Sequence, residues 1–221
     1  MIIIIGSELW CMKRFLKKYI NTDYKFDKLT MLGVICLIIT ISGVFGYVYE
    51  FIFYYFNGGM KEFYLQGGNF LPWINIYAIG AILVYVLTYK LRKRPLLIFI
   101  LSIIICGVLE YIAGWGIYTF LGGTRYWDYN VEILNFGNIG GFICLRSVLF
   151  FGVSSLMLIY LIVPFCYYLA NKMNKKVFLI LSISICSVFL IDEIYNLVVT
   201  KLFNLPKASE IYIKMGFKYV E

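Results

Sequence analysis

The sequence predicts an all-α membrane protein with about five transmembrane helices, built as two parallel helix–loop–helix repeats plus a fifth helix. Of its 221 residues, 62% are hydrophobic and 14% are charged, and the mean hydropathy is +0.85. A soluble domain has roughly 25% charged residues and about 45–50% apolar ones. The excess of apolar residues requires lipid as the solvent for much of the chain. Length and composition together indicate one membrane domain without an attached soluble domain.

The apolar residues gather into five stretches that are each long enough to cross a bilayer, for which about 20 helical residues suffice. We expect transmembrane helices at Leu29–Phe56, Leu71–Tyr89, Pro95–Leu121, Ile143–Leu169 and Val177–Val199. The transmembrane domain thus covers residues 29–200, between a cytoplasmic segment at 1–28 and an external tail at 201–221. The connections alternate between short basic turns and long loops rich in glycine and aromatic residues.

Basic residues alternate from one side of the predicted bundle to the other. Thirteen lysines and arginines lie in the N-terminal segment and the short turns, against six in the long loops and the tail. Positively charged residues concentrate on the cytoplasmic side of membrane proteins. We therefore expect a multi-pass protein of the cell membrane with a cytoplasmic N-terminus and an external C-terminus.

The segment Ser7–Ile20 is too short and too charged to span a membrane. Leu9, Met12, Leu16 and Tyr19 recur in it at helical spacing, with lysine and arginine residues mostly between them. This pattern is typical of an amphipathic helix that lies in the membrane interface. We expect such a helix on the cytoplasmic surface, in contact with membrane lipid.

An internal repeat becomes visible when the sequence is shifted by 64 residues. Ser42–Gly59 then aligns with Cys106–Gly123, with seven identities in eighteen positions. Each copy continues into an Asn-Phe pair and a further span, so the repeats cover residues 29–89 and 95–169. Parallel repeats occur in transporter folds, where shared sites lie between the copies. A repeat that is only architectural is an equal alternative.

Charged residues inside the predicted spans mark a candidate site, because charge in a bilayer is costly and usually functional. They are Glu50, Glu110, Arg146, Asp192 and Glu193. At a rise of about 1.5 Å per residue, all five fall in the outer half of the membrane. Glycines on the same helix faces allow close approach, so Glu50 and Glu110 should point into the bundle. The loop Gly122–Phe142 adds Trp127 and Asp128, which would cap this site.

Three interpretations of these charges are open, because one arginine cannot neutralise four carboxylates. A salt bridge, such as Arg146 with Glu110, would hold the bundle together. A polar pocket would bind or conduct a cationic or protonated substrate. A membrane enzyme would use a carboxylate as its acid or base near the outer surface.

Several classes of chemistry are excluded or disfavoured by residue content. The chain has no histidine, which removes histidine-dependent bases, dyads and metal sites. Four of the six cysteines lie in apolar runs and none forms a Cys-x-x-Cys pair, so packing is their simplest role. No nucleotide-binding glycine motif occurs. We therefore expect no cofactor and no metal, and we select no catalytic residue. We also expect no nucleic-acid partner, because the basic clusters lie next to membrane spans, where they set topology and bind anionic lipid.

The two long loops and their flanking helices carry short motifs, of which the most specific is Trp127-Asp128-Tyr129 followed by Ile143-Cys144-Leu145. Further matching residues are Gly46, Glu50, Phe70-Leu71-Pro72, Ile76-Tyr77, Glu110, Phe136, Ser147, Gly152, Pro164 and Asp192. With these residues, Gly33–Leu169 resembles the CmpB-type ABC-transporter permease family of bacterial membrane proteins, and Ile191–Asn196 agrees more weakly. The chain departs from the family pattern at Phe142, where the family has arginine, and at Phe151, where it has tryptophan. Arg146 is a candidate replacement for the missing arginine.

The resemblance implies a transport component that works with an ATPase subunit supplied in trans. The short basic turns leave only the N-terminal helix as a dock for such a subunit. Two alternatives stay open: a membrane-embedded enzyme acting on a lipid or lipid-linked substrate, and a non-catalytic subunit of a larger membrane complex. The glycine-bearing helix faces suit a homo-oligomer as well as internal packing.

Overall fold

The computed structural model describes residues 22–57, 67–120 and 122–218. Its longer helices are α2 (Lys28–Asn57), α3 (Asn75–Thr88), α4 (Pro95–Phe120), α5 (Leu145–Met157), α6 (Val163–Lys172) and α7 (Lys175–Ile194). Its short elements are η1 (Tyr89–Leu91), η2 (Leu158–Ile162), η3 (Tyr195–Val199), α8 (Thr200–Phe203) and α9 (Ala208–Lys214). No β-strand occurs in the described residues, and the predicted all-α class is confirmed. The predicted amphipathic helix Ser7–Ile20 lies outside them.

In the described part of the chain, four helices are long and apolar enough to cross a membrane. They are Lys28–Phe56, Pro95–Phe120, Leu145–Lys172 and Lys175–Phe203. The third is α5 continued through η2 into α6, and the fourth is α7 continued through η3 into α8. Their bounds fall within about four residues of the predicted spans.

The predicted span Leu71–Tyr89 differs most from the structure. The helix starts only at Asn75, as the 14 residues of α3, and continues through three residues of η1. These 17 residues cover about 26 Å, less than the roughly 30 Å of a hydrocarbon core. Residues 69–73 form a loop instead, because Pro72 disfavours a helical residue before it and side chains of α7 bind the loop backbone.

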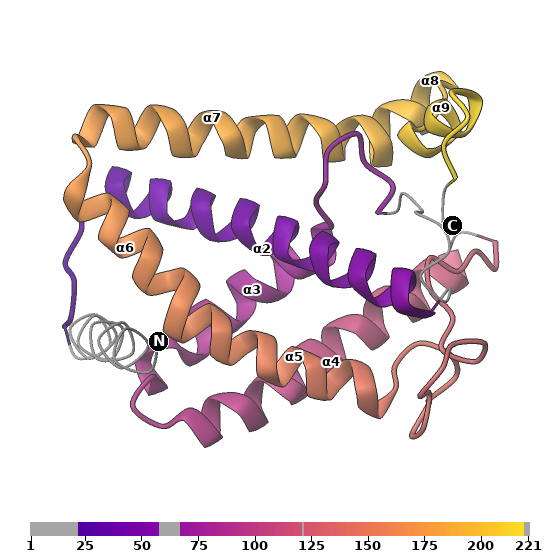
Figure 1. Cartoon of the computed structure of the whole chain (residues 1–221), viewed down its shortest axis with the longest axis horizontal. Coiled ribbons are helices and arrows are strands. Elements are labelled where there is room, and N and C mark those ends of the chain that lie inside the picture. Colours follow the sequence, from indigo (N-terminus) through magenta and orange to yellow (C-terminus); the bar gives the residue numbers. More distant parts are fainter. Residues whose placement is uncertain (1–21, 58–66, 121, 219–221) are drawn as a thin grey trace, which may run out of the picture.

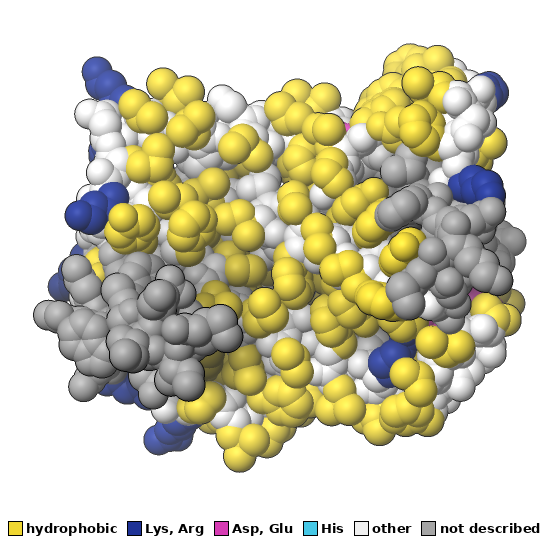
Figure 2. Space-filling view, in the orientation of Figure 1, with side chains coloured by type: hydrophobic (Ala, Val, Ile, Leu, Met, Phe, Trp, Pro, Cys, Tyr) yellow, Lys and Arg dark blue, Asp and Glu magenta, His cyan; other side chains and the backbone are white. Residues whose placement is uncertain are grey.

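The helices run back and forth between two ends of the molecule (Figure 1). One end, the basic end, carries the turns around Arg92 and Asn174; the other, the loop end, carries residues 67–74, 122–144 and 204–216. Helix α2 packs against α3 and α7, and α4 packs against α5. Hydrophobic side chains cover the middle of the face in Figure 2, while lysine and arginine side chains gather at its edges. This distribution is that of a membrane protein.

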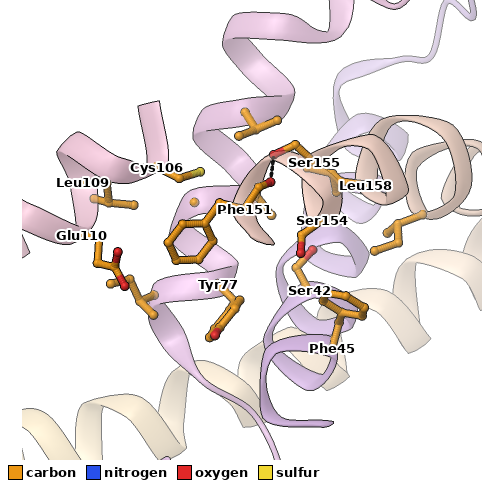
Figure 3. A pocket seen from close by; sticks show the side chains of 15 residues that line it. Ser42, Phe45, Tyr77, Cys106, Leu109, Glu110, Phe151, Ser154, Ser155 and Leu158 are labelled. Atoms are coloured by element: carbon orange, nitrogen blue, oxygen red, sulfur yellow. Dashed lines mark hydrogen bonds between the residues drawn. The ribbon is translucent and has the colours of Figure 1, made fainter. Parts of the chain in front are cut away.

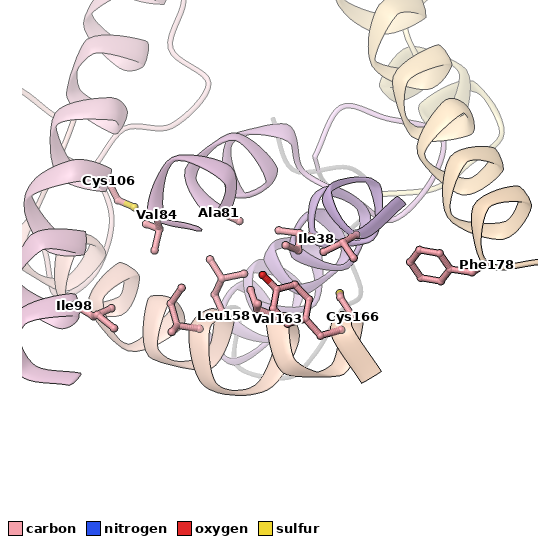
Figure 4. Packing of buried hydrophobic residues seen from close by; sticks show 12 residues of the cluster. Ile38, Ala81, Val84, Ile98, Cys106, Leu158, Val163, Cys166 and Phe178 are labelled. Atoms are coloured by element: carbon pink, nitrogen blue, oxygen red, sulfur yellow. The ribbon is translucent and has the colours of Figure 1, made fainter. Parts of the chain in front are cut away.

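The apolar core joins five of the helical elements (Figure 4). Ile38 of α2, Val84 of α3 and Ile98 of α4 pack in one cluster with Val163 of α6 and Phe178 of α7, and each is at most 1% exposed. Lipid tails are as apolar as these side chains, so close packing and not transfer from water stabilises the contacts. The core therefore holds the five segments in one bundle beneath the loop end.

Polar contacts fix the basic end. Arg92 is buried and pairs with Asp23, while its guanidinium lies 4.7 Å from the centre of the Tyr89 ring. Asp27 accepts hydrogen bonds from Thr30 at the start of α2 and pairs with Lys175 at 3.0 Å. The Thr30 hydroxyl first and then Lys175 hold the pKa of Asp27 well below its usual range. These contacts tie the starts of α2 and α7 together.

Candidate functional site

Glu110 is the most deeply buried carboxylate at the loop end. It lies on α4, is 4% exposed and accepts two hydrogen bonds. The Tyr129 hydroxyl donates to its Oε1 at 2.6 Å, and the Ser147 hydroxyl donates to its Oε2 at 2.9 Å. Burial and the neighbouring Glu110 raise the pKa of Tyr129 well above its usual range. The phenol therefore stays protonated and acts as the hydrogen-bond donor to Glu110. The long loop and the first turn of α5 thus meet on Glu110.

Arg146 lies beside Glu110 but pairs with a different carboxylate. Its guanidinium contacts Glu132, and these side chains are 14% and 13% exposed. The guanidinium also lies 4.2 Å from the centre of the Phe53 ring and 5.4 Å from that of Tyr129. The interpretation that pairs Arg146 with Glu110 is therefore wrong for this structure. Glu132 could not be selected from the sequence, because it stands in an irregular loop outside every apolar span.

Glu50 of α2 completes the group. The Tyr77 hydroxyl of α3 hydrogen-bonds to it, and Glu110 and Glu132 are its carboxylate neighbours. One helical turn earlier, Gly46 lies against the Tyr77 ring so closely that an added Cβ would stand 2.3 Å from the ring carbons. Gly46 thereby lets α3 place Tyr77 on Glu50.

We call Glu50, Glu110, Glu132 and Arg146 the carboxylate cluster. Its members come from α2, α4, the loop after α4, and the start of α5. Among the described residues it holds three carboxylates and one arginine. No group of three or more cysteine, aspartate or glutamate side chains in the described part of the chain is placed to hold a metal ion.

Trp127 and Asp128 hold the long loop in shape. Trp127 donates its indole N–H to the carbonyl oxygen of Phe142 at 2.9 Å. Asp128 Oδ1 accepts from the backbone amide of Asn130 at 3.0 Å and lies 3.5 Å from Arg125 Nη1. Three side-chain atoms, Asn130 Nδ2, Arg125 Nη1 and Asp128 Oδ1, crowd onto Gly141, whose φ is +81° and whose added Cβ would stand 2.3–2.4 Å from them. Only glycine fits that position, and the loop folds around it.

Asp192 and Glu193 lie apart from the carboxylate cluster. They are 6% and 7% exposed on α7, and most of their partners are in the loop before α3. Asp192 accepts from the amides of Phe70 and Leu71 at 3.0 and 2.9 Å, and also from the Trp73 indole and the Asn196 amide. Glu193 accepts from the side-chain amides of Asn69 and Asn75 at 2.7 and 2.9 Å. The structure thus separates the five predicted charges into two groups.

The sequence model of a family described as "Putative ABC-transporter type IV" matches residues 37–197, which is most of the chain and extends from α2 into η3. The chain belongs to this family. No curated protein and no solved structure matches it. Together with the apolar helices, the family match makes this CmpB-type protein a transport-related protein of the membrane.

Phe142 stands where the family resemblance implies an arginine, and in this CmpB-type protein its ring lies next to a different cation. The Arg125 guanidinium lies 4.7 Å from the centre of the Phe142 ring and donates to the carbonyl oxygen of Gly140 at 3.0 Å. Arg146 instead belongs to the carboxylate cluster. The cation next to position 142 is therefore Arg125, which the sequence interpretation did not select.

Proposed function

We propose that this chain is the membrane-embedded component of a transporter, and that the carboxylate cluster binds a cationic or protonated group. The observation that carries the proposal is charge imbalance. Three carboxylates face a single arginine among the described residues, in a largely buried setting. Buried charges are stable when they are paired. A bound cation or proton would supply the missing positive charge.

The hydrogen-bond donors around the cluster support the same proposal. Tyr129 and Ser147 occupy both oxygens of Glu110, and Tyr77 bonds to Glu50. These donors orient the carboxylates before any ligand arrives. A site that is oriented in advance loses less free energy on binding. The aromatic rings of Phe53 and Tyr129, which flank Arg146, would equally suit an organic cation.

We further propose that the basic end faces the cytoplasm and that an ATPase subunit acts in trans. The concentration of lysine and arginine at the basic end supports the orientation. No phosphate-binding motif of the GxxxxGK[ST] type occurs in the sequence, so the energy source would be a separate subunit. With the basic turns this short, the N-terminal segment 1–28 is its proposed dock.

Ligand binding is tested by thermal unfolding of the purified chain in the presence of tetramethylammonium chloride. A ligand at 100 times its dissociation constant stabilises the folded state by about 2.7 kcal/mol. For a chain of this size that raises the Tm by about 5–10 °C. We expect Glu50→Gln and Glu110→Gln to abolish the shift. Glu210→Gln, an equal charge change at an exposed residue of α9, should retain it.

The outcome that contradicts cation binding is equally specific. Equal Tm shifts in the wild type, Glu110→Gln and Glu210→Gln would mean that salt acts outside the cluster.

The transport assignment is tested separately, by purifying the tagged chain from its native membrane in mild detergent. A stoichiometric subunit that hydrolyses ATP supports it, whereas a chain that turns over lipid on its own without nucleotide supports the enzyme alternative.

A further inference from the structure

A cavity of about 50 Å³, partly open to its surroundings, lies among the helices with Glu110 in its wall (Figure 3). Its wall is formed by α2, α3, α4 and α5 with η2, and most of the lining is apolar. Figure 3 shows Glu110 at one side of it and Ser42 and Ser154 at the other, with the rings of Tyr77 and Phe151 between them. The cavity is thus continuous with the carboxylate cluster through Glu110 and Tyr77.

Two serine hydroxyls in the wall lack a hydrogen-bond partner. Ser42 is 4% exposed, and neither its Oγ nor that of Ser154 bonds to any described residue. Serine in a helix commonly donates to the carbonyl one turn earlier. Ser155, the neighbour of Ser154, does so at 2.7 Å to Phe151. Since buried hydroxyls are almost always bonded, the two free ones point to an occupant that the described residues do not supply.

The volume of the cavity limits the size of the molecule that can occupy it. Pockets for small organic molecules begin at about 300 Å³, several times larger than this one. One water molecule takes about 30 Å³ of liquid volume and needs two to four polar partners. Ser42, Ser154 and Glu110 supply such partners at the two sides of the space. Water therefore fits where a larger ligand does not.

The local backbone is consistent with a functional cavity. Leu158 and Ile162, which line it, are the first and last residues of the π-helical turn η2. Pro164, two residues after Ile162, has no backbone N–H to donate to the preceding turn. Single π turns inside α-helices occur frequently at functional sites. Here the turn shifts the register of α5 against α6 beside the cavity.

We propose that this cavity is a water site, a hydrated chamber that extends the carboxylate cluster from Glu110 into the interior of the bundle. The role of the chamber rests on the proposed function: it would let a small hydrated species, a proton above all, reach Glu110 from inside the bundle. The presence of water rests only on the cavity and its two unpartnered hydroxyls.

The test is radiolytic labelling in water enriched in oxygen-18, with mass spectrometry of the labelled side chains. Bound water that is ionised by X-rays labels adjacent rings, so Phe45 and Phe151 should incorporate the isotope. The double substitution of Ser42→Ala with Ser154→Ala removes the polar partners and should lower this labelling at least about threefold. Ser102→Ala is the matched control, because its hydroxyl is also buried and unpartnered in the described residues but lies outside the lining.

A second variant fills the cavity without disturbing its wall. A Cβ added at Gly80 would meet only Cys106 Sγ at 3.7 Å and Leu109 Cδ2 at 3.8 Å, which are ordinary contacts. Gly80→Ala should therefore fold normally and also reduce the labelling of Phe45 and Phe151. Labelling that stays unchanged in both variants, or is absent from both rings in the wild type, overturns the proposal.

Failure of the water-site proposal can be told apart from failure of the proposed function. If cations leave the Tm unchanged while the rings are labelled in the serine-dependent manner, the chamber exists but does not serve a cation site. If cations shift the Tm through Glu110 while no ring is labelled, the cluster binds its ligand without the chamber.

Discussion

Replacing Asp192 by asparagine should release the loop that precedes α3. In the wild type, Oδ1 of Asp192 accepts from the Phe70 amide at 3.0 Å and Oδ2 accepts from the Leu71 amide at 2.9 Å. Each oxygen also accepts a side-chain donor, from Asn196 at 2.8 Å and from Trp73 at 3.0 Å. All four bonds use the carboxylate as acceptor only.

The asparagine side chain can satisfy half of these donors. Its carbonyl oxygen keeps one pair, while its NH₂ group faces the other pair with a donor against donors. A buried donor left without a partner costs about 1–3 kcal/mol, and the part-buried amides of Phe70 and Leu71 stand at the lower end of that range. Two such donors give about 2–6 kcal/mol, and at least one belongs to the backbone of Phe70 or Leu71, whichever oxygen is replaced.

Hydrogen–deuterium exchange of the peptide that contains Phe70 and Leu71 measures this directly. A loss of about 2 kcal/mol in local opening corresponds to roughly 30-fold faster amide exchange. Glu193→Gln is the matched control, because Glu193 binds only the side-chain amides of Asn69 and Asn75. It should leave both backbone amides protected.

Unchanged exchange in Asp192→Asn would refute the reasoning. It would mean that the loop is held by its other contacts, such as the bond from Tyr212 to the carbonyl of Phe70 at 2.7 Å. Equal acceleration in Asp192→Asn and Glu193→Gln would likewise reject a specific role for the two backbone bonds.

Two further predictions concern helix packing. Gly46→Ala should force α2 away from Tyr77, because the new Cβ would stand 2.3 Å from the ring. Overpacking of this kind costs about 1–3 kcal/mol of folding free energy, which lowers the Tm by about 2–12 °C. Gly116→Ala, with nothing within 4 Å of the new Cβ, is the control, and an equal Tm loss in both would contradict the argument. Cys36 of α2 and Cys186 of α7 are in side-chain contact, so mild oxidation should link them. Mass spectrometry of unreduced peptides detects that link, and its absence under oxidation would argue against the α2–α7 interface.

The long helices could be predicted from sequence because twenty or more apolar residues between basic turns have few other solutions. The start of α3 could not, since apolar residues 70–74 look like part of a span. Their loop conformation depends on Asp192, which is more than a hundred residues away in sequence. Contacts of that kind leave no periodic signal.

The candidate site was only partly visible for a related reason. Glu50 and Glu110 stand out because they interrupt apolar helices and share faces with glycines. Glu132 has neither feature, and only the folded loop brings it to Arg146. Asp192 and Glu193 look the same as Glu50 in sequence, yet their oxygens are occupied by the loop before α3. Burial of charge can be read from a sequence, whereas the partner of the charge depends on tertiary structure.

The alignment of the two sequence repeats gives the contact between Gly46 and Tyr77 a further meaning. Gly46 aligns with Glu110, and Glu50 aligns with Gly114, so the two copies carry the same two residue types in exchanged order. If the copies descend from one duplicated ancestor, each lost a different half of an acidic pair. The surviving carboxylates then differ by one helical turn, about 6 Å along the helix axis. Two identical subunits would place their acids at a single level, whereas divergence of this kind within one chain would place them at two levels.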